Sequence, residues 1–285
     1  MSDSIQLSNC AYGKTGVRLI KVERKGARHH VRDLNVAIQF FGAFENAYIE
    51  GDNHSILPTD TMKNTVYVLA RQQTLGEIED FGGRIANHFL ARNSHLTRVK
   101  ITICENIWKR ITFHGHQHDS SFQMSGPESR TAVIDANPAK MSIYAGIKNL
   151  VVLKTSRSSF QHFLRDEYTI LKDTGDRLFA SSINAEWSYQ NGVGDFKKNW
   201  FCIRSNLLST FATHESRSVQ HTLYAMGYAV LQQVGAIEEI RLAMPNRHCL
   251  TVDLSPFCLD NPNEVFVPIE EPSGWIEATL NRYVP

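Results

Sequence analysis

Apolar and polar residues alternate in two runs near the start of the chain, residues 17–24 and 30–42, on either side of a turn near Gly26. A period of two is typical of strands that bury one face, and two such runs joined by a short turn predict a β-hairpin. Apolar positions in residues 61–93 instead recur at helical spacing, with an interruption at Gly76. We therefore expect two consecutive helices after the hairpin.

Period two returns in residues 97–111, 129–137 and 141–156. The first half of the chain thus predicts the order strand, strand, helix, helix, strand, strand, and the second half repeats this order with little residue identity. Antiparallel sheets with helices on one face keep open edges, and joining the edges of several subunits into a barrel removes them. The pattern predicts an α+β protein of two similar units that forms an oligomer.

In the second half, residues 177–189 have the pattern of a strand, and residues 216–235 that of an amphipathic helix closed by a glycine. Residues 239–254 predict a β-hairpin with Pro245 and Asn246 at its bend.

The segment that begins at Leu153 also spaces its apolar residues as a helix does; they are Phe160, Phe163, Leu164, Tyr168 and Leu171. This spacing predicts an amphipathic helix whose apolar stripe faces a core, with Ser158 and Ser159 as N-cap residues. Phe160 follows these caps directly, so its ring belongs to the helix entrance and can face a cleft. Arg177 follows the helical run among polar residues.

Length and charge limit the class of protein. A chain of 285 residues is long enough for about two domains with a sizeable core. Thirty Lys and Arg oppose 29 Asp and Glu, which gives a net charge of +1 without a long run of either sign. This balance argues against binding to nucleic acid.

The cysteines are odd in number, scattered and never spaced as C-x-x-C; they are Cys10, Cys104, Cys202, Cys249 and Cys258. This pattern argues against a disulfide framework or a zinc finger and suits a reducing compartment. The sequence has no apolar run of membrane-spanning length and no signal peptide at its N-terminus. We therefore expect a cytoplasmic protein that does not bind membranes.

The stretch HGHQHD places His114, His116 and His118 at alternate positions, followed by Asp119. On a strand, alternate side chains share one face, so these histidines are a possible set of metal ligands. No second cluster of ligands accompanies them, and we favour an exposed polar strand or loop without a metal.

Single polar residues elsewhere allow two interpretations. Asp60 or Thr61 can cap the helix that follows, or the free N–H groups at that helix start can bind an anion beside Thr59. Lys14 and Gln220 can be solvated surface residues or parts of a site. None of them decides the function alone.

Five stretches together resemble the urate oxidase (uricase) family in spacing and order, from about residue 10 to about residue 280. They are YGKTGVRLIKV, LPTDTMKNTVY, LKTSRSSFQHFLRDEYTILKDTGDRLFA, SVQHTLYAMG and MPNRHCLTVDLS. The resemblance implies the tunnelling fold, with two tandem β-β-α-α-β-β units, residues 1–145 and 146–285, that assemble as a homotetramer around a β-barrel tunnel. It also implies oxidation of urate by O₂ to 5-hydroxyisourate and hydrogen peroxide, without a metal or organic cofactor.

The resemblance implies a substrate-binding set in which Arg177 and Gln220 hold the pyrimidinedione edge of urate and Phe160 stacks on its ring. Further contacts are assigned to Leu171, to the backbone of Val219 and Asp60, and to Ile276.

The resemblance also implies a catalytic set. Asn246 helps to hold O₂ or peroxide, while Lys14, Thr59 and His248 form a proton relay through an ordered water. Lys14, Thr59 and Asp60 are expected from a neighbouring subunit, so the site is expected at a subunit interface.

One alternative from another class remains, a purine- or pterin-ring hydrolase of the same fold that uses a metal. His114, His116 and His118 would be its ligands. A purine-binding oligomer without catalysis is a further alternative, but it would not require Lys14, Thr59, Asn246 and His248.

Overall fold

The computed structural model describes residues 5–189, 195–269 and 271–282. The chain divides into two compact units, Met1–Ala145 and Gly146–Pro285, which are described separately. No helix in the described ranges is long and apolar enough to cross a membrane.

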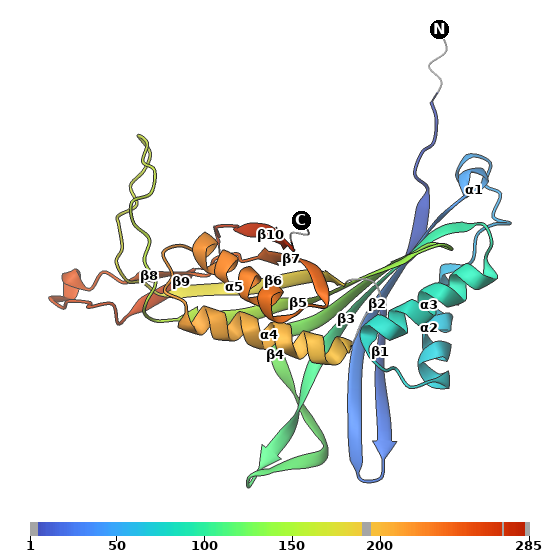
Figure 1. Ribbon diagram of the computed structural model, residues 1–285, viewed down its shortest axis with the longest axis horizontal. Helices are drawn as coiled ribbons and strands as arrows, with labels where there is room; N and C mark the ends of the chain where they lie inside the picture. Colours follow the sequence, from blue (N-terminus) through green and yellow to red (C-terminus); the bar gives the residue numbers. More distant parts are fainter. Residues whose placement is uncertain (1–4, 190–194, 270, 283–285) are drawn as a thin grey trace. The chain divides into compact units, whose positions relative to one another are not determined.

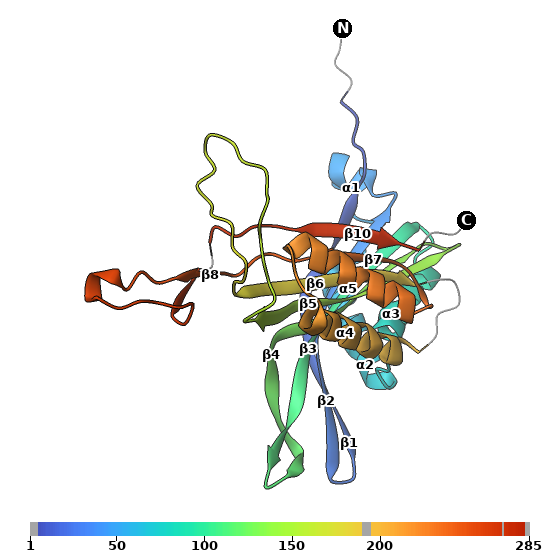
Figure 2. The ribbon, with the colours of Figure 1, turned by 60° about the vertical axis from the view of Figure 1, so that its left-hand side comes forward.

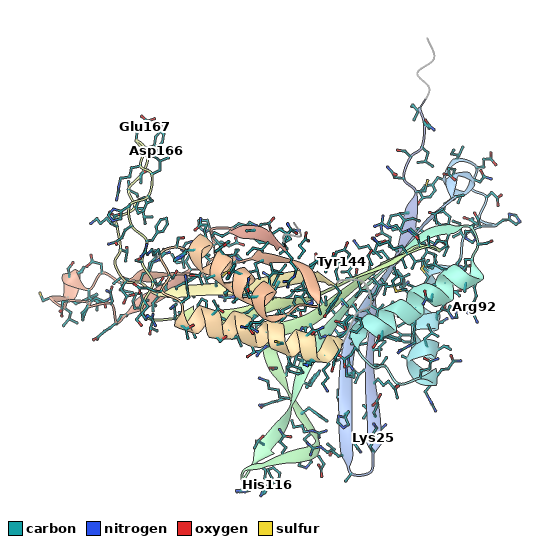
Figure 3. The ribbon with its side chains drawn as sticks, in the orientation of Figure 1. Lys25, Arg92, His116, Tyr144, Asp166 and Glu167 are labelled. Atoms are coloured by element: carbon teal, nitrogen blue, oxygen red, sulfur yellow. The ribbon has the colours of Figure 1, made fainter. Side chains whose placement is uncertain are left out.

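The first unit contains an antiparallel sheet in the order β1 (Ala11–Lys25), β2 (Arg28–Gly42), β3 (Leu96–Phe113) and β4 (His116–Ala136). The predicted hairpin is confirmed, and Gly26 takes up its turn with a φ of 62°. Figure 1 shows β1 and β2 in blue as a long ribbon, and Figure 3 labels Lys25 at its tip.

Three helices connect β2 to β3: α1 (Glu45–Ile49), α2 (Thr59–Gln72) and α3 (Ile78–Arg92). The two predicted helices correspond to α2 and α3 and are confirmed. α3 packs on β3 and β4, and α2 packs on β1. Their apolar faces meet the sheet in a continuous core that includes Met62, Phe81 and Phe40, each fully buried.

The second unit holds most of β5 (Met141–Lys154), followed by β6 (Phe179–Tyr189), α4 (Phe196–Thr213), α5 (Val219–Gln233) and β7 (Ile237–Ala243). The chain then leaves the main sheet in an excursion, residues 244–276, that contains β8 (His248–Thr251), the 3₁₀ turn η1 (Ser255–Phe257) and β9 (Phe266–Ile269). It returns to the main sheet as β10 (Glu277–Asn281). The sheet of this unit has the order β5, β6, β7, β10. α4 and α5 lie on one face of it in both views (Figures 1 and 2).

The core of the second unit explains how these helices are held on the sheet. Trp187 of β6 is buried, as are Ile203 and Leu207 on one face of α4. Trp200, also on α4, donates from Nε1 to the carbonyl oxygen of Gly146 at 3.1 Å. The apolar stripe of α4 therefore packs inward, and Trp200 adds a polar contact to β5 beneath it. The sequence pattern had not singled out this helix.

The helix predicted after Ser158 is wrong. Residues 155–178 form an irregular loop, here called the arm, which projects from the unit, and Figure 3 labels Asp166 and Glu167 at its tip. Leu164 and Ile170 are 95% and 93% exposed, so their helical spacing does not face a core. The physical reason is that the two ends of the arm pair with each other and with Ser216, as described below.

The hairpin predicted for residues 239–254 is also wrong. β7 pairs with β6 on one side and with β10 on the other, whereas β8 pairs with β9 in a separate two-stranded sheet. Pro245 and Asn246 lie between β7 and β8, at the point where the chain leaves the main sheet.

Candidate active site

A cavity of about 440 Å³ lies within the second unit, between the base of the arm, the start of α5 and the segment after β7. Its volume falls in the range typical of small-molecule sites. Every site residue that the sequence predicted in this unit lines the cavity; these are Phe160, Leu171, Arg177, Val219, Gln220, Asn246, His248 and Ile276. The fold thus gathers residues from four separate parts of the chain.

Phe160 and Arg177 meet because the two ends of the arm are paired. The backbone N–H of Phe160 donates to Thr174 O at 2.9 Å, and the N–H of Thr174 returns a bond to Phe160 O at 3.0 Å. Arg177 donates its own N–H to Ser158 O at 2.8 Å. These backbone bonds, and not a helix, bring the two side chains together.

The Arg177 guanidinium lies with its central carbon 5.1 Å from the centroid of the Phe160 ring. Its Nε is buried and has no hydrogen-bond partner, and no carboxylate in the described part of the chain forms an ion pair with it. Burial lowers the pKa of Arg177 from its usual value, yet a guanidinium stays charged at any ordinary pH. The cavity therefore presents a half-buried cation with unused donors, which favours an anionic ligand.

Val219 and Gln220 are the first two residues of α5. The N-cap is Ser218, whose side chain accepts from the His221 N–H at 3.1 Å. Val219 is buried, while the Gln220 side chain remains exposed at the cavity. The helix start therefore offers an amide side chain, and backbone N–H groups at this end favour negative charge.

Asn246 is held between β6 and the segment that precedes β10. Its N–H donates to Gly274 O at 2.9 Å, and the N–H of the next residue, Arg247, donates to Ala180 O at 3.0 Å. Nearby, the Met244 N–H donates to Ile276 O at 2.7 Å. This backbone pairing sets Asn246 and Ile276 in the same wall, with His248 at the start of β8.

Leu171 lies on the returning limb of the arm and is 55% exposed, although it lines the cavity. The Arg165 guanidinium donates to Leu171 O at 2.8 Å, which fixes this part of the arm locally.

Three predicted residues belong to the first unit and do not line this cavity: Lys14, Thr59 and Asp60. Lys14 precedes a register shift in β1, and Thr59 and Asp60 begin α2. The positive charge of Lys14 contributes to lowering the pKa of Asp60, after the larger effect of its hydrogen bond and ion pair with Lys63. β1, which carries Lys14, packs against α2 in the same unit.

The start of α2 decides one of the alternatives left by the sequence. Its N-cap position is Pro58, and no side chain caps the helix. Asp60 instead accepts from Lys63 and, at 2.8 Å, from Asn64. The simple capping role expected of Asp60 or Thr61 is therefore wrong.

Sequence reasoning missed several residues of the cavity wall. They are Thr174, Asp176, Leu178, Phe179, Ala180, Arg247, Cys249, Leu250, Thr251, Asn263 and Phe266. Some lie within the motifs quoted above, but Asn263 and Phe266 carried no signal because they belong to the excursion that pairs β8 with β9.

The histidine stretch lies at the tip of the β3–β4 ribbon. His114 is in the turn with a φ of 47°, so only His116 and His118 share a strand, and Figure 3 shows His116 at the tip. In the ranges that the structure describes, no three His, Cys, Asp or Glu side chains are placed to hold a metal ion.

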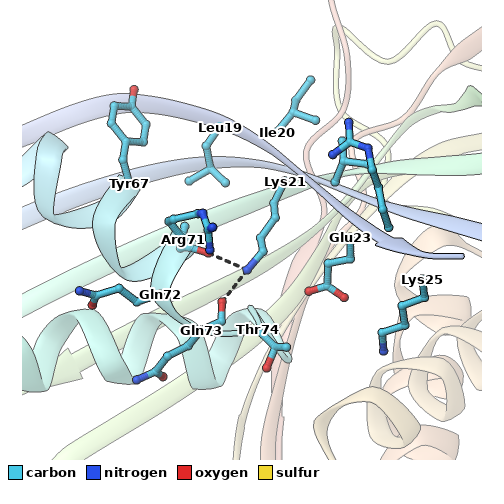
Figure 4. A pocket seen from close by; sticks show the side chains of 13 residues that line it. Leu19, Ile20, Lys21, Glu23, Lys25, Tyr67, Arg71, Gln72, Gln73 and Thr74 are labelled. Atoms are coloured by element: carbon cyan, nitrogen blue, oxygen red, sulfur yellow. Dashed lines mark hydrogen bonds between the residues drawn. The ribbon is translucent and has the colours of Figure 1, made fainter.

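A larger hollow of about 750 Å³ lies in the first unit between β1 and the end of α2 (Figure 4). The Lys21 ammonium crosses it and donates to Ala70 O at 2.6 Å and to Gln73 O. A cation on the last carbonyls of a helix stabilises the helix end. We therefore regard this hollow as structural.

Fold and cavity define the class: an α+β protein with antiparallel sheets whose cavity suits a flat anion. The profile of the uricase family matches residues 10–135 and 143–277. The chain belongs to the uricase family, and the tunnelling-fold class predicted from the sequence is confirmed.

Individual relatives agree with this assignment. Uricase from Arthrobacter globiformis is 41% identical over 98% of this chain and 90% of the relative, and uricase from Dictyostelium discoideum is 37% identical over 95% and 96%. The crystal structure of the Arthrobacter enzyme matches with a TM-score of 0.93 at 41% identity, over 98% of this chain and 96% of that chain. A uricase structure from Bacillus fastidious matches at 0.83 and 25% identity, over 95% and 93%.

Proposed function

We propose that this protein oxidises urate with O₂ to 5-hydroxyisourate and hydrogen peroxide. The reaction balances when water is included: urate, O₂ and H₂O become 5-hydroxyisourate and H₂O₂. Two electrons leave urate, and O₂ takes them up with two protons. The observation that carries the proposal is the unpaired Arg177 guanidinium beside Phe160 and Gln220 in one cavity, in a chain of the uricase family.

Arg177 and Gln220 bind the polar edge of urate. The guanidinium supplies a fork of N–H donors to the anion, and the Gln220 amide can both donate and accept. Phe160 supplies a flat apolar face for the purine ring. Leu171 and Ile276 close the apolar rim, while the backbone N–H of Val219 and of Asp60 completes the hydrogen bonds to the ligand.

Proton transfer and O₂ binding fall to the remaining residues. Urate must lose a proton before electron transfer, and peroxide must gain protons before it leaves. Lys14, Thr59 and His248 move these protons through an ordered water, and Asn246 holds O₂ or peroxide above the ring. We assign no step to a metal or organic cofactor.

We further propose a homotetramer in which Lys14, Thr59 and Asp60 of one subunit complete the cavity of a neighbour. The sheets of such a tetramer form a β-barrel tunnel. Five free cysteines support a reducing compartment, and we propose the cytoplasm. Partners are then urate, O₂ and further copies of the chain, with no nucleic acid and no membrane.

The metal-dependent hydrolase receives no support. The relatives carry the name uricase, and His114, His116 and His118 lie in the first unit, outside the lining of the cavity that holds Arg177.

One assay tests the proposed function. Purified protein with a strong chelator should consume urate, followed by its ultraviolet absorbance, with matched O₂ uptake and peroxide release. Urate loss without O₂ uptake, or activity abolished by the chelator and restored by a metal, would contradict the proposal.

A further inference from the structure

The turn between α4 and α5 contains two histidines that the proposed mechanism does not use. His214 directly follows α4, and His221 lies in the first turn of α5. Their ring centroids are 4.3 Å apart with an interplanar angle of 66°. His214 Nδ1 also lies 3.3 Å from Oγ1 of Thr222, a fully buried residue.

The surroundings of His214 disfavour a positive charge on its ring. The Arg217 backbone N–H points to His221 Nδ1 at 3.4 Å, so this nitrogen is the acceptor in that contact. The Lys154 ammonium donates to His214 O at 2.6 Å. Burial lowers the pKa of His214 most, and His221, Lys154 and Arg157 lower it further, against a smaller opposing effect of Glu215. Burial and Arg157 lower the pKa of Lys154, whereas the carboxylates of Asp176 and Glu215 raise it.

The same turn supports the backbone of the cavity. The Ser159 N–H donates to Ser216 O at 2.8 Å, next to Phe160, and the Ser216 N–H donates to Arg157 O at 3.0 Å. Ser158 O accepts from the Arg177 N–H. Ser216 lies two residues after His214 in this turn, and its backbone hydrogen bonds join the turn to the base of the arm. α5 itself begins at the cavity wall.

We propose that His214 is a positioning residue of the urate site. In contact with His221 and Thr222, neutral His214 holds the α4–α5 turn so that Gln220 faces the cavity and Ser216 aligns the base of the arm. This inference rests on the proposed function. Protonated His214 places a cation against His221, Lys154 and Arg157, so the turn shifts and urate binding weakens.

The direction of the pH effect follows from the lowered pKa of His214. The ordinary value for histidine is 6.5, so the neutral ring and its stabilisation are fully present above that pH. They are lost as the pH falls from 6.5 through the lower pKa of the folded protein. The effect should appear in KM, because His214 acts on the residues that bind urate and not on the proton relay.

The test compares KM and kcat for urate between pH 5.5 and 8.5 in the wild type and His214→Gln. Glutamine can still bond to Thr222 but cannot be protonated. We expect KM at pH 8 within about twofold of the wild type, and a variant KM that falls to about a third of the wild-type value at the acid end. The ratio of the variant KM to the wild-type KM at each pH cancels the effect of the protonation of urate itself.

Two further variants separate positioning from simple packing. His221→Gln removes the neighbouring ring that disfavours a charge, so the acid rise in KM should move to higher pH. Thr222→Val removes the hydrogen bond but no titrating group, so KM should rise at every pH without a change in the shape of the profile. Superimposable KM profiles for wild type and His214→Gln, or a defect confined to kcat, would overturn the inference.

Melting temperatures distinguish this inference from the proposed function. A wild-type protein without urate turnover at pH 8 contradicts the proposed function alone. The melting temperature of His214→Gln relative to wild type should rise as the pH falls below 6.5. A difference that is constant over pH would overturn the role of neutral His214, whatever the protein turns over.

Discussion

The Arg177 guanidinium stands over the Phe160 ring, with 5.1 Å between its central carbon and the ring centroid. Phe160 and Arg177 lie on the two limbs of the arm at its base, which the Phe160 and Thr174 backbone pair closes. One loop base therefore supplies both a flat apolar face and a forked cation to the same cavity. A flat, anionic ring satisfies both at once.

Arg177→Ala should raise KM for urate by about 10- to 100-fold, because hydrogen bonds to charged groups contribute about 1.5–3 kcal/mol. Steady-state kinetics with urate measure the change. Lys172→Ala removes a cation from an exposed position of the same arm, outside the cavity, and should leave KM unchanged. A near-normal KM in Arg177→Ala would show that the anion is held elsewhere.

Phe160→Leu keeps an apolar wall but loses the aromatic face. An aromatic pair contributes about 0.5–1.5 kcal/mol beyond buried area, so KM should rise by up to about tenfold, less than for Arg177→Ala. Phe163→Leu is the matched control, since Phe163 stacks on Phe160 at 4.9 Å but does not line the cavity. The ranking is wrong if Phe160→Leu is the more damaging change by a factor of ten.

Combined replacement of His114, His116 and His118 by alanine should leave urate turnover largely intact, because these residues lie at a ribbon tip outside the cavity. Activity is measured on protein shown to be folded and to have the oligomeric state of the wild type. An inactive but correctly assembled variant would reopen a metal or proton role for this ribbon.

Thr59→Ala and Arg177→Ala should complement each other, since we propose that they serve one site from two chains. Each variant alone should be a poor enzyme. When the two are unfolded together and reassembled, some interfaces carry both defects and others carry none, so part of the wild-type activity should return. Mixed tetramers identified by mass analysis that gain nothing over the parents would mean that both residues act within one chain.

Two adjacent glycines of α3 test the packing of the first unit. A Cβ added at Gly82 would lie 2.3 Å from Ile134 Cδ1, whereas one at Gly83 would lie 3.4 Å from Met141 Sδ, an ordinary contact. Gly82→Ala should therefore destabilise the protein by about 1–3 kcal/mol through overpacking. Gly83→Ala should stabilise it by up to about 1 kcal/mol through helix propensity. Denaturant unfolding measures both, and equal effects would contradict the packing described for α3.

Much of the architecture follows from local patterns in the sequence. The β1–β2 hairpin, α2 and α3 were predictable because each buries one face along its length, which leaves period two or helical spacing in the residues. The predicted site residues of the second unit came from motif resemblance, and they line one cavity. Their sequence spacing alone gave no reason for them to meet.

Only the tertiary structure decided the conformation of the arm and the strand pairing of the chain after β7. Phe160, Phe163 and Leu164 have helical spacing, but backbone bonds from Ser158–Phe160 to Thr174, Ser216 and Arg177 hold the segment in an open loop. The apparent partner of β8 was β7, yet both edges of β7 are already occupied by β6 and β10, so β8 pairs with β9. Local periodicity determines which residues can form strands and helices, whereas the partner of each edge depends on hydrogen bonds between segments far apart in the chain.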